Sequence, residues 1–402
     1  MAASRTILIA GAGIGGLVTG LALAKSGFRT EVFEQSARPE DQGAGIQLSP
    51  NAMHVLLALG LGEALRPHVV SAEYVRVRKA RSGRDLARVP LGLHAEQRYG
   101  APYWMIHRGD LQKALIEAVH GNPDVALTLG SKVQDFVVHA NGVTAQVRSG
   151  HTAKEERGIA LVGADGLWST LRTRLGHTEP PEFRRRTAWR ATVPADAVPW
   201  EFREPAVNLW LGRHAHLVHY PVKAGHLINI VAIVRDEEAS QPGWSNAGAR
   251  EEIIARFRRP WAVGARNMVA APEHWSKWSL YDRAPERQWS NGPITLVGDA
   301  AHAMLPFLAQ GATMAIEDAA VLAECLAASP EDPAKGMRRY EAQRYNRTLR
   351  VQREARRNAA LYHASGVEAV LRNVVLRGLR GKGLLRRYDW LYGWRSPTRE
   401  TI

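Results

Sequence analysis

The chain has 402 residues, of which 45% are hydrophobic, with 36 glycines, 21 prolines and a formal net charge of +14. This length exceeds what one core usually supports, so we expect two interleaved domains, and the composition excludes a disordered chain. The basic residues are scattered and accompany no zinc-finger spacing or RNA-binding signature, which indicates a solvated surface rather than a nucleic-acid partner.

The single cysteine, Cys325, can form neither an intrachain disulfide nor a cysteine-based metal site. We therefore expect a cytoplasmic protein without a metal. Residues 6–24 carry no charge, but five glycines interrupt them and no cleavage site follows. This pattern favours a buried strand, a glycine turn and a helix over a signal peptide or a membrane span, so we expect no membrane partner.

The first predicted unit is a strand over residues 5–10, a turn with the sequence GAGIGG, a helix to about residue 25 and a second strand, TEVFE. Gly11 permits the tight turn, Gly13 lets a pyrophosphate approach the backbone, and Gly16 lets the helix lie against the strand. Glu34 ends the second strand, where its carboxylate can accept ribose hydroxyls. The pattern predicts a bound dinucleotide without deciding between FAD and NAD. The predicted contacts are Gly11, Gly13, Ile14, Gly15, Gly16, Glu34 and Gln35.

Two further segments each combine a turn with a charged residue. In residues 105–119, Arg108 precedes an amphipathic helix and Asp110 lies near its N-cap. In residues 160–172, a buried strand runs into a turn that contains Asp165. Taken alone, each segment is also explained by a surface arginine or by a capping aspartate.

Over residues 180–280, the sequence pattern changes to one typical of antiparallel strands. The stretches LWLGRHAHLVHYPV and HLINIVAIVRD predict two adjacent antiparallel strands joined by Lys223-Ala224-Gly225. Alternation along the first strand places His214 and His216 on one face and His219 on the other. A histidine titrates near neutral pH and can take a phenolic proton, but a packed or solvent-facing strand histidine explains each residue equally well.

Residues 298–322, GDAAHAMLPFLAQGATMAIEDAAVL, open as the end of a buried strand and close as an amphipathic helix. Between these elements lie residues that no core helix needs, which are Gly298, Asp299, His302, Pro306 and Gly311. Such a turn is expected to face a ligand. Residues 333–362 then predict a long arginine-rich helix with a solvated face.

In this order, the motifs resemble those of the single-component FAD-dependent aromatic hydroxylases, which include the salicylate, 3-hydroxybenzoate and 6-hydroxynicotinate hydroxylases. The resemblance runs the whole length of the chain. One departure is that His302 precedes Ala303, where family members commonly have His-Pro. The shared motifs are GAGIQLSPNAM (43–53), IHRGDL, GADG, YDR (281–283), LVGDAAH, LAQGATMAIEDA and DWLYGW (389–394).

The resemblance implies bound FAD and assigns residues to it. It implies that Arg108 reaches the ribityl and pyrophosphate region and that Asp165 helps to hold the pyrophosphate side. It also implies that Asp299 accepts from a ribityl hydroxyl and that the backbone of Val133 meets the adenine. Gly45 is a further predicted cofactor contact.

The resemblance also places the 298–322 segment against the flavin ring. Pro306 would lie in a rigid turn beside the ring. The N–H groups of Gly311, Ala312 and Thr313 would begin a helix aimed at the flavin N1–C2=O edge. A positive helix end there stabilises the anionic reduced flavin.

For the substrate pocket, similarity to 3-hydroxybenzoate hydroxylase implies that His216 helps the substrate phenol. Similarity to the nicotinate branch matches His219 with a tyrosine that touches substrate. We predict His216 as the base, His219 as the second candidate and Tyr220 as a pocket-lining partner, although core packing explains Tyr220 equally well. Gln47 and Pro306 complete the predicted substrate contacts.

The predicted fold is α/β. A Rossmann-like FAD-binding domain of the para-hydroxybenzoate hydroxylase (PHBH) type is interleaved with an antiparallel-sheet substrate domain, and a helical segment ends the chain. The FAD-binding domain is expected over residues 1–70, 101–179 and 281–330, the substrate domain over 71–100 and 180–280, and the C-terminal helical segment over 331–402.

The predicted function is hydroxylation of an aromatic ring with NAD(P)H and O2 through a flavin C4a-hydroperoxide, on a hydroxybenzoate, salicylate-like or hydroxypyridine carboxylate substrate. NADH and NADPH both stay open, because no second glycine fingerprint holds the pyridine nucleotide. One alternative is a flavin monooxygenase or epoxidase for a larger non-carboxylate ring or a quinone. Another is a flavin-binding regulator without enzymatic activity. A homodimer, common among relatives, is compatible with the sequence.

Overall fold

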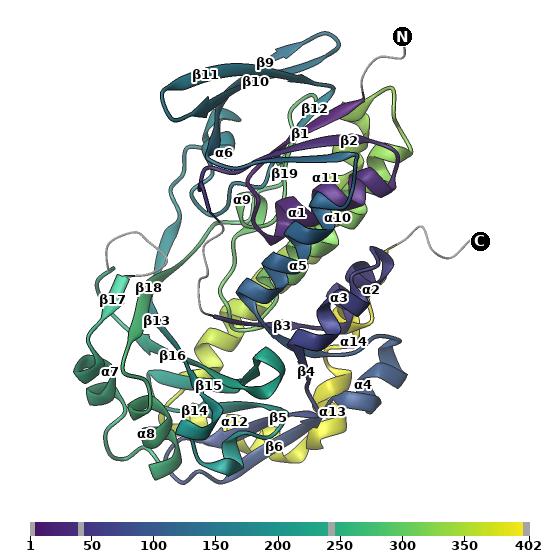
Figure 1. Cartoon of the computed structure of the whole chain (residues 1–402). Helices are drawn as coiled ribbons and strands as arrows, with labels where there is room; N and C mark the ends of the chain where they lie inside the picture. Colours follow the sequence, from purple (N-terminus) through teal and green to yellow (C-terminus); the bar gives the residue numbers. More distant parts are fainter. Residues whose placement is uncertain (1–4, 39–43, 240–245, 397–402) are drawn as a thin grey trace.

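The computed structural model describes residues 5–38, 44–239 and 246–396. Two sheets dominate it, a parallel sheet in the upper half of Figure 1 and a larger, mostly antiparallel sheet in the lower half. In these three ranges, no helix has the length and apolar character needed to cross a bilayer. The predicted domain ranges also include residues 1–4, 39–43, 240–245 and 397–402, which lie outside the described part, as does Gly43 of the GAGIQLSPNAM motif.

The parallel sheet has five strands in the order β19-β12-β1-β2-β8, and all its neighbouring strands run parallel. All five residues of β1 are buried, as expected for a strand whose two faces are covered. Helices α1, α5 and α10 lie beside this sheet in Figure 1. The strands are β1 (Thr6–Ala10), β2 (Arg29–Phe33), β8 (Val125–Thr128), β12 (Ala160–Gly163) and β19 (Ile294–Leu296), and the helices are α1 (Ile14–Lys25), α5 (Arg108–His120) and α10 (Gly311–Ala327).

The predicted β-α-β unit is present in this sheet. The helix ends at Lys25, as expected, and β2 stops one residue before Glu34. The mixed α/β architecture, with one parallel sheet and a separate antiparallel sheet, is confirmed. The division into residue ranges for each domain stays a prediction.

The larger sheet has eight strands in the order β17-β18-β13-β16-β15-β14-β5-β6. Neighbouring strands are antiparallel, except that β14 and β5 run parallel. Its strands are β5 (Tyr74–Lys79), β6 (Asp85–Pro90), β13 (Glu182–Pro194), β14 (Ala206–Leu211), β15 (Ala215–Val222), β16 (Leu227–Arg235), β17 (Asn246–Gly248) and β18 (Trp275–Asp282).

One strand expectation is wrong in detail. The stretch LWLGRHAHLVHYPV forms a hairpin of two strands, because β14 ends at Leu211 and β15 begins at Ala215. The backbone of Gly212 donates to Ala215 O at 3.1 Å, and His214 has a φ of +59°. His214 therefore lies in the turn and does not share a strand face with His216. The second predicted strand is β16, joined to β15 by a short 3-10 turn over Lys223–Gly225.

Two smaller sheets and the remaining helices complete the described chain. One sheet contains β9 (Ser131–His139), β10 (Gly142–Ser149) and β11 (Thr152–Gly158), and the other contains β3 (Gly45–Leu48), β4 (Val69–Ser71) and β7 (Trp104–His107). The other helices are α2 (Pro50–Ala58), α3 (Gly62–Leu65), α4 (Gly92–Tyr99), α6 (Thr170–Arg174), α7 (Arg250–Arg256), α8 (Val263–Ala270), α9 (Asp299–His302), α11 (Pro333–Tyr362), α12 (Gly366–Gly378), α13 (Arg380–Arg386) and α14 (Asp389–Tyr392).

The long helix α11 has the predicted bounds and connects the two large sheets (Figure 1). Near its start, the Tyr340 hydroxyl donates to Leu296 O in β19 at 3.1 Å. At its end, the ring of Tyr362 lies 5.3 Å from that of His216 in β15, between centroids. One helix therefore contacts both the parallel sheet and the eight-stranded sheet.

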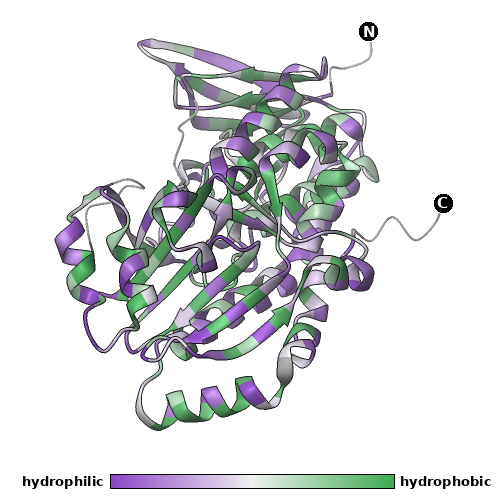
Figure 2. Ribbon diagram, turned by 60° about the horizontal axis from the view of Figure 1, so that its bottom comes forward, coloured by the Kyte–Doolittle hydropathy of each residue, from purple (hydrophilic) through white to green (hydrophobic). Residues whose placement is uncertain are grey.

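Helix α12 lies at the bottom edge of the molecule in Figure 2, where hydrophobic and hydrophilic residues alternate along it. None of its residues is buried. Its apolar residues recur every three or four positions, so they form one exposed stripe along the helix. They are Val367, Val370, Leu371, Val374 and Val375, followed by Leu379 just after the helix.

Candidate active site

The glycine turn after β1 is packed on one side and open on the other. A Cβ built on Gly11, which has a φ of +103°, would lie 2.4 Å from Ala164 O. A Cβ on Gly16 would lie 1.9 Å from Gly11 O. A Cβ on Gly13, the N-cap of α1, meets nothing within 4 Å. The turn therefore needs glycine for its own packing at two positions and leaves open space beside the third.

The carboxylate of Glu34 is fixed next to this turn. Its Oε2 accepts from the backbone N–H of Ala12 at 2.8 Å, and its Oε1 accepts from Ser36 N at 2.9 Å. Its backbone carbonyl accepts from Ser131 N at 2.7 Å, so β9 starts beside Glu34. Val133, two residues further, is buried in β9, whereas Gln35 is exposed. The structure thus gathers the residues predicted for the adenosine half of the cofactor.

Asp165 lies at the end of β12, next to the glycine turn. Its Oδ2 accepts from Leu171 N at 3.1 Å, while Ser169, the N-cap of α6, accepts from Arg172 N at 2.8 Å. The Oδ1 of Asp165 is buried and has no hydrogen-bond partner in the described residues. Burial raises the pKa of this carboxyl, although hydrogen bonds from Ser169 and nearby backbone groups oppose the shift. One oxygen of Asp165 is therefore available to a bound group.

The 298–322 segment brings Asp299 and the start of α10 together. A Cβ on Gly311 would lie 4.0 Å from Asp299 Oδ1. Burial raises the pKa of Asp299, and His302 and Arg108 act in the opposite direction. No hydrogen bond to the Asp299 carboxylate occurs among the described residues. Thr313 Oγ1 in the first turn of α10 is buried without a partner there.

Pro306 begins a tight turn before α10. Its carbonyl accepts from Ala309 N at 3.1 Å, and Ala309 has a φ of +53°. The next residue, Phe307, is buried and its ring lies 5.1 Å from that of His216, between centroids. The turn therefore lies against the face of β15 that carries His216.

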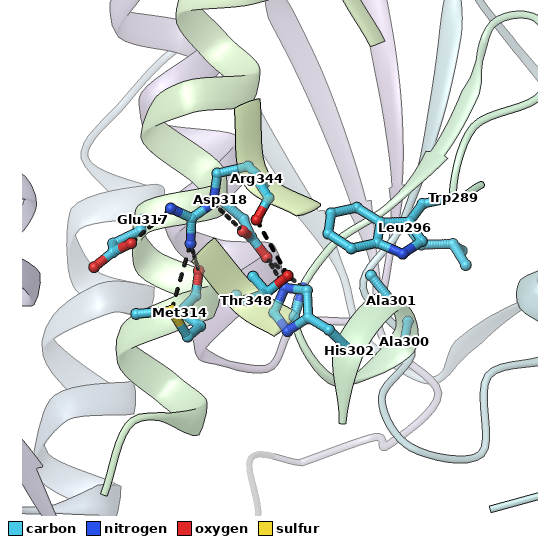
Figure 3. Close-up of polar contacts among 12 residues, drawn as sticks. Trp289, Leu296, Ala300, Ala301, His302, Met314, Glu317, Asp318, Arg344 and Thr348 are labelled. Atoms are coloured by element: carbon cyan, nitrogen blue, oxygen red, sulfur yellow. Dashed lines mark hydrogen bonds and ion pairs between the residues drawn. The ribbon is translucent and has the colours of Figure 1, made fainter. Parts of the chain in front are cut away.

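A buried ionic network attaches the 298–322 segment to helix α11 (Figure 3). His302 Nε2 lies 2.6 Å from Asp318 Oδ2, and Arg344 Nε donates to Asp318 Oδ1 at 2.7 Å. Arg344 also donates to Glu317 Oε2 at 2.6 Å. Burial acts to raise the pKa of Asp318, but His302 and Arg344 outweigh it and hold that pKa at about 2. His302, the point of departure from the family motif, is thus a fixed partner of α10.

Arg108 and Asp110 open helix α5. Arg108 is its first residue, and its backbone N–H donates to Ala44 O at 2.8 Å, which ties α5 to the start of β3. The N-cap of this helix is His107, and Asp110 lies in its first turn rather than at the cap. The Asp110 carboxylate pairs instead with Lys223 Nζ at 2.9 Å, which joins α5 to the β15–β16 turn.

The two faces of β15 have different neighbours. His216 Nδ1 lies 2.8 Å from His363 Nε2, at the end of α11, and both rings contact Phe307. His219 points to the opposite face, where its Nε2 accepts from Trp210 Nε1 at 3.0 Å and its ring packs on Phe202. The structure therefore does not bring His219 to the side on which His216 and Phe307 meet.

The face of the sheet that carries His219 borders a different cavity from the region around His216. A cavity of about 690 Å³ opens on that side of the sheet and is lined by residues that include Arg78, Trp210 and Trp261. None of the residues predicted for the cofactor or the substrate lines this cavity. It is therefore not the site that the sequence motifs assemble.

Tyr220 faces the same side as His216 and meets β3. A Cβ on Gly45 would lie 2.6 Å from Tyr220 Cε2, and Gly45 N donates to Asn229 Oδ1 at 2.7 Å. Two residues along β3, Gln47 Oε1 accepts from the Tyr103 hydroxyl at 2.7 Å. Burial raises the pKa of Tyr220 to about 12, partly opposed by Arg190 and by a hydrogen bond with Gln47. Tyr220 is thus a neutral hydroxyl donor at the junction of the two sheets.

Sequence reasoning missed two residues of this junction, His363 and Tyr103. His363 is 147 residues from its partner His216, and Tyr103 is 56 residues from Gln47. Neither belongs to a motif, so no local pattern could have pointed to them. Burial lowers the pKa of His363 to about 3, as expected for a neutral partner of His216.

These features fit an FAD. The open position beside Gly13 suits a pyrophosphate at the start of a helix. The unpartnered oxygens of Asp165 and Thr313, together with the free carboxylate of Asp299, provide polar groups for hydroxyl and ring atoms. By contrast, the described residues contain no group of three or more histidine, cysteine or acidic side chains that could hold a metal ion.

Comparison with known proteins decides the family. The family model described as "FAD binding domain" matches residues 4–355. The chain belongs to this family. It is 37% identical over 394 residues to 3-hydroxybenzoate 6-hydroxylase 1 of Aquipseudomonas alcaligenes, covering 97% of this chain and 98% of that one. It is 34% identical over 369 residues to 6-hydroxynicotinate 3-monooxygenase of Pseudomonas fluorescens, covering 90% and 93% of the two chains.

A solved structure agrees with these relatives. The FAD complex of a point variant of HpxO from Klebsiella pneumoniae superposes with a TM-score of 0.85 at 25% identity, covering 96% of this chain and 98% of that one. The resemblance predicted from the motifs is confirmed. This hydroxylase is an FAD-dependent monooxygenase of the aromatic-hydroxylase type, a class that uses NAD(P)H and O2.

Proposed function

We propose that this hydroxylase acts on a small ring that carries both a hydroxyl group and a carboxylate, of the hydroxybenzoate or hydroxypyridine carboxylate class. The observation that carries the proposal is the shared face of β15, from which His216 and Tyr220 project toward the Phe307 turn and β3. The printed names of the 3-hydroxybenzoate and 6-hydroxynicotinate relatives support the substrate class, because both name a hydroxylated ring acid.

In this proposal, His216 takes the proton of the ring hydroxyl. Burial lowers the pKa of His216 well below its usual value, and His363 and Arg186 add to the effect, so the imidazole is neutral at pH 7 and can accept a proton. His363 holds Nδ1, and among the described residues no hydrogen bond engages Nε2. Nε2 is therefore the atom we assign to the phenol, whose deprotonation makes the ring more electron-rich.

The other proposed substrate contacts surround this base. The Tyr220 hydroxyl stays protonated and donates a hydrogen bond, and the Gln47 amide, already bonded to Tyr103, is held in one orientation. Pro306 forms a wall of the pocket at the tight turn before α10. His219 is not part of the proposal, because it faces Trp210 and Phe202 on the other side of the sheet.

For the cofactor, we propose that the glycine turn and α1 hold the pyrophosphate and that Arg108 and Asp165 flank it. Bound FAD would supply hydride acceptance from NAD(P)H and the activation of O2. Glu34 and Val133 would hold the adenosine, and Asp299 the ribityl chain. The remaining assigned contacts are Gly11, Gly13, Ile14, Gly15, Gly16, Gln35, Gly45, Pro306, Gly311, Ala312 and Thr313.

The test is NADH and NADPH oxidation by the purified holoenzyme across a panel of hydroxybenzoates, aminobenzoates and hydroxynicotinates, with product analysis. We expect at least one ring acid to accelerate flavin reduction and to yield its hydroxylated product in proportion to the nucleotide consumed. The same panel determines which nucleotide is preferred. If no ring acid accelerates reduction, or if all of them only release hydrogen peroxide, the proposed substrate class is wrong.

A homodimer and a cytoplasmic location also belong to this proposal. The exposed apolar stripe of α12 supports the dimer, because a contiguous apolar surface marks an interaction site and a stripe of valine and leucine is complementary to its own copy. Light scattering after gel filtration should give the mass of two chains for the wild type. The double variant Val370→Asp/Val374→Asp should give the mass of one chain. A monomeric wild type would contradict the proposed dimer.

A further inference from the structure

Arg190 in β13 projects from the same face of the eight-stranded sheet as His216 and Tyr220. Directly paired residues of antiparallel strands share a face. Arg190 pairs with Val231 of β16, and Val231 pairs with Val218 of β15, which lies midway between His216 and Tyr220. The preceding residue, Trp189, packs in the core of the opposite face. The motifs of the sequence did not include Arg190.

The guanidinium of Arg190 has no acidic partner in the part of the chain that the structure describes. Among the described residues, it forms no ion pair and no hydrogen bond, and its Nε is buried. The ring of Trp278 lies beneath it, 3.8 Å from Cζ to the ring centroid. Burial lowers the pKa of Arg190 to about 9, with an opposing effect of Tyr220 and a further lowering by Arg108.

The two most deeply buried arginines of the described residues are paired with carboxylates. Arg344 lies 2.6 Å and 2.7 Å from the carboxylates of Glu317 and Asp318, and Arg172 lies 2.7 Å from Glu286. Removing a cation from water without a counter-charge is unfavourable, so an unpaired buried arginine is expected to meet an anion that is not part of the chain. The Arg190 side chain keeps part of its surface accessible, so an anion could reach it.

We propose that Arg190 binds the carboxylate of the ring substrate and thereby selects ring acids over neutral phenols. This inference rests on the proposed function, since it divides the substrate between a hydroxyl end at His216 and a carboxylate end at Arg190. A guanidinium can donate two parallel hydrogen bonds to a carboxylate, and the Trp278 ring holds its plane in place.

The experiment compares wild type, Arg190→Met, Arg190→Lys and Arg266→Met as FAD-loaded enzymes. Arg266 lies in α8 and lines the cavity on the other side of the sheet, so this control removes the same charge away from the site. The best ring acid from the panel and its carboxamide are titrated against each variant, and binding is followed by the change in flavin absorbance. The FAD content and the dissociation constant for FAD are measured for every variant.

For Arg190→Met, we expect roughly a 30- to 1000-fold weaker affinity for the acid, the usual loss when one partner of a buried charge pair is truncated. Its affinity for the carboxamide should change less than about 3-fold, Arg190→Lys should recover part of the loss, and Arg266→Met should match the wild type. Equal losses for acid and carboxamide, or a loss of FAD alone, would overturn the inference.

The two proposals fail in distinguishable ways. If the wild type hydroxylates a ring acid and Arg190→Met binds that acid normally, only the carboxylate assignment of Arg190 is wrong. If the wild type binds and hydroxylates only neutral rings, the proposed substrate class fails first, and the assignment of Arg190 fails with it.

Discussion

At the residue scale, His216 and His219 are three positions apart on one strand and face different interiors. His216 meets His363 and the Phe307 turn, whereas His219 accepts a hydrogen bond from Trp210. Because the side chains of a strand alternate, the two histidines can be exchanged for glutamine separately, each reporting on one side of the sheet.

We expect His216→Gln to lower kcat by roughly 10²- to 10⁴-fold while FAD binding is unchanged, since a glutamine cannot accept the phenolic proton. The deficit should shrink as the pH is raised toward the phenol's own pKa of about 10, where the substrate arrives already ionised. Steady-state rates between neutral and alkaline pH measure both effects. His219→Gln is the matched control and should stay within about 3-fold of the wild type; equal losses in the two variants would contradict a proton-transfer role for His216.

Gly13 allows a second test at this scale. Its φ of −66° suits any residue, and a Cβ there meets no protein atom within 4 Å. Gly13→Ala should therefore fold with normal stability yet bind FAD at least about 10-fold more weakly, because the added methyl would occupy the place of the pyrophosphate. Fluorescence titration of the apoprotein measures the affinity. Gly378→Ala, where a Cβ also meets nothing within 4 Å, is the control. An unchanged FAD affinity in Gly13→Ala would contradict the placement of the pyrophosphate at this turn.

How far the sequence predicted these residues depends on how local their geometry is. The glycine turn, Glu34 and Asp165 were predictable because each is fixed by neighbours within one turn or strand end. His363 and Arg190 were not, because their meaning comes from strands and a helix end that are distant in the chain. For the same reason, alternation correctly placed His216 and His219 on opposite faces, yet it could not say which face meets the Phe307 turn.

At the element scale, α9, α10 and α11 are held together by the network of His302, Asp318, Glu317 and Arg344. Arg347, one turn further along α11, donates to Glu317 and to the carbonyls of Trp390 and Leu391, so the C-terminal segment is attached to the same cluster. The sequence IEDA (316–319), part of the LAQGATMAIEDA motif, was predictable as a family signature. The attachment of α11 to this motif was not predictable, because the sequence of α11 indicated only a solvated arginine-rich face.

We expect Arg344→Met to lower the free energy of unfolding by about 3–5 kcal/mol, because it leaves the carboxylates of Glu317 and Asp318 buried with fewer counter-charges. Urea denaturation monitored by tryptophan fluorescence measures the change. Arg338→Met, on an exposed position of the same helix, should change stability by less than about 0.5 kcal/mol. A small loss in Arg344→Met would show that the network contributes to positioning rather than to stability.

Prediction of the elements themselves was most accurate where hydrophobic periodicity was long. Helices α1 and α11 end where expected, and the ends of β1 and β2 differ from expectation by at most one residue. The hairpin of β14 and β15 was missed, because Gly212, Arg213 and His214 lie between two apolar runs that together resemble one strand. The tight turn depends on a left-handed φ at His214, which its residue type does not indicate.

At the scale of the whole molecule, three histidines are buried in neutral form. Burial is the main cause that lowers the pKa of His219 and of His363 to about 3 and that of His216 well below its usual value. The folded pKa of each lies below the unfolded value of about 6.5, so unfolding takes up protons. Their contribution to stability is complete above pH 6.5 and is lost as the pH falls from there toward 3.

We therefore expect the free energy of unfolding to fall by up to about 4 kcal/mol per pH unit below the unfolded pKa, at about 1.4 kcal/mol for each histidine. Urea titrations at about pH 7, 6 and 5 measure the slope. His219→Gln should reduce the slope by about 1.4 kcal/mol per pH unit, because it removes one of the three histidines that take up a proton on unfolding. A slope equal to that of the wild type would mean that His219 is already protonated in the fold.

Strand β15 lies between the proposed substrate space and a structural core, which limits how the enzyme can change its substrate. Positions 215, 217 and 219 are constrained by the packing on the core side. On the other face, His216 and Tyr220 carry proposed roles in every turnover, so Val218 between them is the position that can vary toward new rings. A library randomised at position 218 should yield many folded and active variants with altered selectivity. One randomised at the odd positions should yield few soluble proteins. New specificity could then arise at a single residue between two fixed substrate contacts, without any change in the core.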